Sequence, residues 1–154
     1  MKAHEAGVKR ILGILAYLVK DSDPDGLELF FTCSKKKIKD KDPAKLVAGF
    51  AANKPGGLTD IRTRLILIID NYIKRFDRNW FLKKVKPDRS LNIYVLTDGI
   101  WQSVTDLTPP IQRLIKKLSE DGRYQVGIQF ISFGNDPDAI KRLNHLDENL
   151  GLGM

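Results

Sequence analysis

The chain has 154 residues, of which 42% are hydrophobic and 29% are charged, a balance that is typical of a soluble globular domain and excludes an intrinsically disordered chain. Lys and Arg number 26 against 19 Asp and Glu, and the net charge of +7 favours anionic partners without determining the fold. The sequence has one cysteine, Cys33, which excludes an intramolecular disulfide, and no Cys/His cluster of the kind that binds zinc. We therefore expect an intracellular, cytoplasmic protein.

The first predicted element is a helix over about residues 4–20, where apolar side chains recur at helical spacing. Its apolar run at 11–19 has the length of a signal-peptide core, but no small-residue cleavage site follows it. The run is also shorter than the roughly 20 residues that cross a bilayer. We therefore expect a buried helix and no membrane partner.

A polar turn at 21–26 follows, and its acidic residues match the opening of an EF-hand calcium loop. Thr32 stands where that loop needs its bidentate glutamate, so we expect a solvated turn and no calcium site. Residues 27–33 then predict a strand. The lysine run at 35–39 predicts a short edge strand or a loop, since edge lysines discourage association between sheets. No aromatic residue interleaves with these lysines, so we expect no nucleic-acid partner.

The rest of the chain alternates helices with apolar strands. The patterns predict helices over about 43–53, 61–76 with an extension toward 82, 108–118 and from 137 onward, and strands over 91–96 and 126–133. Long connections between strands indicate right-handed crossovers, so we expect an α/β fold with a doubly wound, mainly parallel sheet and helices on both faces. In such sheets the ligand site lies in the loops that follow the strands.

Two segments near these strand ends carry oxygen ligands. Thr59 follows a glycine pair and precedes a predicted helix, and taken alone this segment is a turn with Thr59 or Asp60 as helix cap. Asp98 directly follows a predicted strand, and taken alone its Asp-Gly turn is weak evidence of a functional site. A threonine hydroxyl and a carboxylate at neighbouring strand ends together suit magnesium.

Three strings of the sequence resemble the von Willebrand factor A-type domain, and most closely its intracellular fungal branch: GLTD at 57–60, NIYVLTDGIWQ at 92–102 and VGIQFISFG at 126–134. The resemblance spans nearly the whole chain and implies a doubly wound sheet with a metal-ion-dependent adhesion site. It assigns Thr59 and Asp98 as ligands of a magnesium ion. In that family the metal keeps one position open for an acidic group of a partner protein.

The chain departs from this family at the motif Asp-x-Ser-x-Ser, which the sequence lacks. No strand is predicted before the first helix either, and Met1 matches a methionine that often follows the motif. We therefore expect a single but incomplete domain over 1–154, truncated at both ends, whose sheet lacks the family's first central strand. Because Thr59 and Asp98 supply only one formal charge, we expect a weak or inactive magnesium site.

The resulting prediction is a non-enzymatic protein-interaction module without catalytic residues or an organic cofactor. Its expected partner is a protein that presents an acidic group. Three alternatives stay open. A magnesium-dependent hydrolase or transferase would use Asp98 together with Asp60, Asp106 or Asp136. A basic nucleic-acid-binding domain would account for the net charge, and a fragment without function would account for the missing motif.

Overall fold

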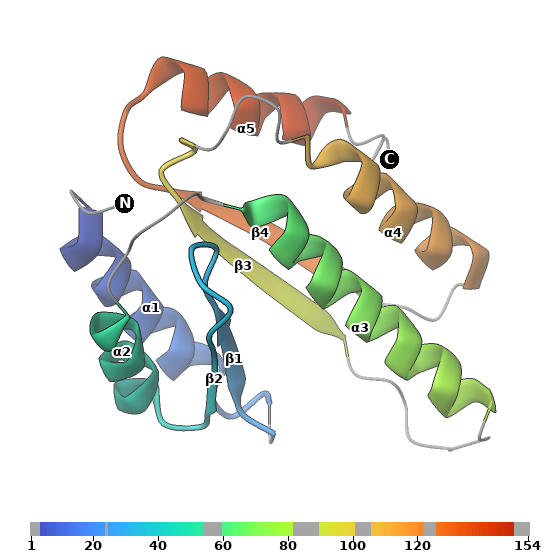
Figure 1. Ribbon diagram of the computed structural model, residues 1–154, viewed down its shortest axis with the longest axis horizontal. Helices are drawn as coiled ribbons and strands as arrows, with labels where there is room; N and C mark the ends of the chain where they lie inside the picture. The colour runs from blue at the N-terminus through green and yellow to red at the C-terminus, as the bar shows by residue number, and fades with distance from the viewer. Residues whose placement is uncertain are drawn as a thin grey trace. The chain divides into compact units, whose positions relative to one another are not determined.

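The computed structural model describes residues 4–23, 25–53, 60–81, 90–100, 106–121 and 126–149 (Figure 1). The chain divides into two compact units, Met1–Asp60 and Ile61–Met154. Among its described residues, the first unit contains α1 (Glu5–Val19), β1 (Leu27–Phe30), β2 (Lys37–Asp40) and α2 (Pro43–Ala52). The second contains α3 (Ile61–Phe81), β3 (Leu91–Thr97), α4 (Thr108–Asp121), β4 (Val126–Ser132) and α5 (Pro137–Asn149).

In the first unit β1 and β2 form an antiparallel pair that packs against α2. Alternation along the strands places Leu29 and Ile38 opposite each other on one face of this pair. Ile38 lies so close to Gly49 of α2 that a side chain at Gly49 would collide with it. Just after β1, Phe31 stacks on Phe50 of α2 with 6.4 Å between the ring centroids. Apolar contacts therefore hold the hairpin to the helix.

The helix α1 also packs against α2, and its burial is uneven. Val8 and Ala16 are buried, but Ile14, Tyr17 and Leu18 have exposed fractions of 46%, 63% and 68%. Spacings of three and four residues place these three side chains on one face of the helix. The prediction that this helix is buried is therefore wrong for the face that carries Ile14, Tyr17 and Leu18, because α1 packs against α2 with a different face.

The second unit is built on a parallel pair, β3 and β4, in register from Leu91 opposite Val126 to Thr97 opposite Ser132. The helix α4 lies between these strands in the sequence, as a parallel crossover requires. Helix α3 packs against α4, and Arg113 of α4 pairs with Asp70 of α3. One buried apolar core joins β3 to the three helices, and Val126, Ile128 and Phe130 of β4 pack against it. Its buried members are Ile61, Leu65, Ile69, Ile93, Leu107, Ile111, Leu114 and Leu146.

The mixed α/β class and the predicted helices are confirmed. The described strands form two two-stranded sheets, one antiparallel and one parallel. The strand predicted over 27–33 is shorter, since β1 ends at Phe30 and a bend follows, while the lysine run contributes β2. The helix predicted from 61 extends to Phe81, as its pattern allowed. No helix among the described residues is long and apolar enough to cross a membrane.

Candidate functional site

The turn that follows β3 is held by hydrogen bonds from both sides. Thr97, the last residue of β3, is buried, and its Oγ1 accepts a hydrogen bond of 2.9 Å from the Gly99 N–H. Its carbonyl oxygen accepts a hydrogen bond of 2.8 Å from the N–H of Phe133, the residue after β4. The segments that leave the carboxyl ends of the two parallel strands are therefore tied together, and Asp98 stands between two fixed neighbours.

This turn also packs against α5. Gly99 has a φ of +71°, a left-handed conformation that glycine adopts without steric cost. A Cβ at Gly99 would lie 2.5 Å from the Cβ of Ala139 in the first turn of α5. One turn further along α5, the Arg142 Nη1 donates a hydrogen bond of 3.2 Å to the Gly99 carbonyl oxygen. The position of the turn thus depends on α5 as well as on β3.

Asp98 is half-buried in this turn, and its Oδ1 accepts a hydrogen bond of 3.2 Å from the Ile100 N–H. Burial raises the pKa of the Asp98 carboxyl, and the hydrogen bond from the Ile100 N–H lowers it. The side chain is therefore an anion at neutral pH. It presents carboxylate oxygen, the ligand type that magnesium prefers.

Thr59, the second predicted magnesium ligand, lies outside the described residues, together with the glycines that precede it. Asp60 is described and belongs to the first unit, where its N–H donates a hydrogen bond of 3.3 Å to the Thr32 carbonyl oxygen. Asp98 belongs to the second unit. The pairing of Thr59 with Asp98 stays a prediction.

Two further carboxylates near the strand ends cap helices. The Asp106 Oδ1 accepts a hydrogen bond of 2.8 Å from the Thr108 N–H at the start of α4. The Asp136 Oδ1 accepts hydrogen bonds of 3.0 Å and 2.9 Å from the N–H groups of Asp138 and Ala139, and so caps α5. The pKa of Asp106 is lowered, first by the hydrogen bonds from Thr108 and then by the charges of Arg62 and His145. Both carboxylates therefore stabilise the start of a helix.

The donor set around Asp98 is small. Within the part of the chain that the structure describes, no three His, Cys, Asp or Glu side chains lie close enough together to hold one metal ion. The cationic Arg142 lies next to the turn through its bond to Gly99. Sequence reasoning missed this arginine, although its spacing of three residues from Ala139 places both on one helix face.

No family model, no curated protein and no solved structure matches the chain. Its function is therefore inferred from the turn after β3 and from the sequence strings that resemble the von Willebrand factor A-type domain.

Proposed function

We propose that this protein is a non-enzymatic protein-interaction module of von Willebrand factor A type. Its interaction site would be the turn after β3, with Thr59 and Asp98 forming a partial and weak magnesium site. The doubly wound sheet with helices on both faces belongs to the same proposal. The observation that carries it is the position of Asp98, which directly follows a parallel strand in a turn fixed by Thr97, Gly99 and α5. In parallel α/β sheets this edge is where ligands bind.

The chemistry of Asp98 fits one ligand of a hard cation. Its carboxylate supplies the anionic oxygen, and a threonine hydroxyl such as that of Thr59 would supply a neutral one. A single negative charge attracts a divalent ion weakly, so we expect a dissociation constant on the order of millimolar. Magnesium at this site would supply a positive charge that an acidic side chain of a partner protein can approach.

The roles of the neighbouring residues support binding over catalysis. A hydrolase that uses Asp98 needs a second acid or base, and two of its three candidates, Asp106 and Asp136, bind N–H groups at the starts of α4 and α5. Arg142 donates to a backbone carbonyl oxygen of the turn, which makes it a positioning residue. These contacts favour a preformed surface whose polar groups are held in place for a partner.

The proposal is tested with Mn²⁺, a paramagnetic substitute for magnesium, in an NMR titration of the full chain. Bound Mn²⁺ should broaden the amide signals of Gly99 and Ile100 at millimolar concentration. Asp98→Asn keeps the shape of the side chain but removes its charge, and it should abolish the broadening. Glu120→Gln removes an exposed carboxylate from α4 and serves as the control that leaves broadening unchanged. Equal broadening in the wild type and in Asp98→Asn would contradict the proposal.

A further inference from the structure

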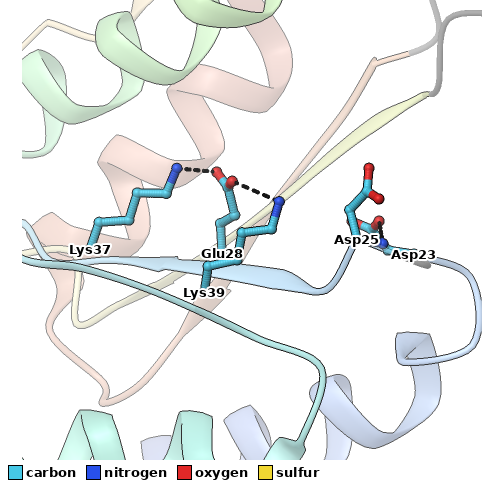
Figure 2. A network of polar contacts seen from close by, with 5 residues as sticks. All are labelled: Asp23, Asp25, Glu28, Lys37 and Lys39. Carbon is cyan, nitrogen blue, oxygen red and sulfur yellow. Dashed lines mark hydrogen bonds and ion pairs between the residues drawn. The ribbon is translucent and has the colours of Figure 1, made fainter.

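The face of the β1–β2 hairpin opposite to Leu29 and Ile38 carries charge and one aromatic ring. The register places Lys39 opposite Glu28 and Lys37 opposite Phe30, and alternation puts all four side chains on this one face. Figure 2 shows both lysines reaching toward Glu28, with ion pairs of 2.8 Å from Lys37 and 3.6 Å from Lys39.

Basic side chains outnumber acidic ones on this face. The side chains of Lys37 and Lys39 are exposed by 45% and 46%, and Glu28 balances only one of their two charges. Lys35 and Lys36 are exposed in the bend that leads into β2. We call these four lysines together with Glu28 and Phe30 the hairpin face. Asp23 and Asp25 lie near its end in Figure 2, and four lysines against these two and Glu28 still leave a positive net charge, as binding to a polyanion requires.

Strand pairing also brings an aromatic ring among the lysines. The Lys37 Nζ lies 5.1 Å from the centroid of the Phe30 ring. In the sequence Phe30 stands seven positions before Lys37, which is why the lysine run seemed to have no aromatic neighbour. The reason for expecting no nucleic-acid partner therefore does not hold in the folded hairpin. A ring beside cations is the combination with which proteins bind unpaired bases and their phosphates.

We propose that the hairpin face binds single-stranded nucleic acid. The lysines would contact phosphates, and Phe30 would stack on a base once the flexible Lys37 side chain moves from its ring to a phosphate. Charge alone would serve an acidic protein equally well, and the ring is what favours nucleic acid. Glu28 would weaken binding, because its carboxylate competes with phosphate for Lys37 and Lys39.

The test uses the full chain and a fluorescein-labelled 12-nucleotide oligothymidylate, with binding followed by fluorescence anisotropy at several salt concentrations. Lys37→Ala and Lys39→Ala should each weaken binding roughly three- to tenfold and reduce the slope of log K against log salt by about 0.7. Phe30→Leu should weaken binding by a similar factor and leave this slope unchanged. Lys116→Ala, at an exposed lysine of α4, is the control that changes little.

Glu28→Gln gives the sharpest outcome, because a variant that merely damages the fold does not bind more tightly. It should strengthen binding roughly three- to tenfold and steepen the salt dependence. Equal affinity in Glu28→Gln and the wild type would overturn the proposal, as would unchanged slopes in both lysine variants. Polyglutamate that competes as well as unlabelled oligothymidylate, with no effect of Phe30→Leu, would identify a surface for acidic proteins and also overturn it.

Discussion

Gly99 and Ala139 are so close that the space between them excludes even a methyl group. A Cβ at Gly99 would lie 2.5 Å from the Ala139 Cβ and 3.1 Å from its Cα. The two residues come from different elements, the turn after β3 and the start of α5, and the contact fixes one against the other. Asp98 precedes Gly99 in the chain, so the contact also fixes the backbone that carries the proposed magnesium ligand.

We predict that Gly99→Ala lowers the free energy of unfolding by about 2–4 kcal/mol, because it combines a positive φ with a collision at Ala139. Urea unfolding measures the change. Gly13→Ala is the matched control: its added methyl meets only Val47 Cγ2 at 3.6 Å, and alanine raises helix stability by about 0.5–1 kcal/mol. Equal effects of the two substitutions would contradict this account of the turn.

The core of the second unit should respond to truncation according to burial. Ile69 is fully buried in α3, so Ile69→Ala should cost about 2–5 kcal/mol in the free energy of unfolding. Leu67 lies two residues away in the same helix with an exposed fraction of 39%, and Leu67→Ala should cost less than about 1 kcal/mol. Chemical denaturation of both variants checks the difference. Similar costs would mean that the apolar face of α3 is assigned wrongly.

The cap of α5 should depend on the side-chain oxygen of Asp136 and hardly on its charge. Asp136→Ala removes the acceptor for two N–H groups and should destabilise the protein by about 1 kcal/mol. Asp136→Asn keeps an acceptor oxygen, and asparagine caps helices about as well as aspartate. We therefore expect the Asn variant to unfold within about 0.5 kcal/mol of the wild type in urea. If Asp136→Asn lost as much stability as Asp136→Ala, the charge of Asp136 would matter more than its acceptor oxygen.

Asp106 should contribute a pH-dependent part of the stability. The Thr108 hydrogen bonds lower the pKa of Asp106 in the folded protein below that of the unfolded chain, which is about 4. Its stabilisation is therefore complete above about pH 4 and decreases as the pH falls through the folded pKa. Asp106→Asn retains an acceptor for Thr108 and does not titrate. Urea unfolding between pH 2 and 7 should show the wild type losing stability relative to this variant only at the acidic end.

Local signals in the sequence were enough to predict the helices. The apolar stripe of α3, the proline at the start of α2 and the Asp136 cap each depend on residues within a few positions of one another. They do not depend on what the rest of the chain does, so the pattern alone predicts them. The parallel pairing of β3 with β4 followed from two apolar runs separated by a helix.

Features that depend on distant residues were not predictable. The contact between Arg142 and Gly99 spans 43 positions, and no local pattern indicates it. The proximity of Phe30 to Lys37 depends on the pairing of β1 with β2. The sequence alone did not decide whether the lysine run forms a strand or a loop, so it could not predict this pairing. The exposure of Leu18 depends on which side of α1 meets α2. Each of these is set by tertiary packing.

The most direct test of the proposed function is thermal unfolding of the wild type and of Asp98→Asn, each in EDTA and in 10 mM magnesium. With a dissociation constant of about 1 mM, magnesium at this concentration stabilises the folded state by about 1.4 kcal/mol. The account predicts that Tm of the wild type rises by roughly 3–6 °C and that Tm of Asp98→Asn does not change. Coincident unfolding curves of the wild type in EDTA and in magnesium would contradict a magnesium site at Asp98.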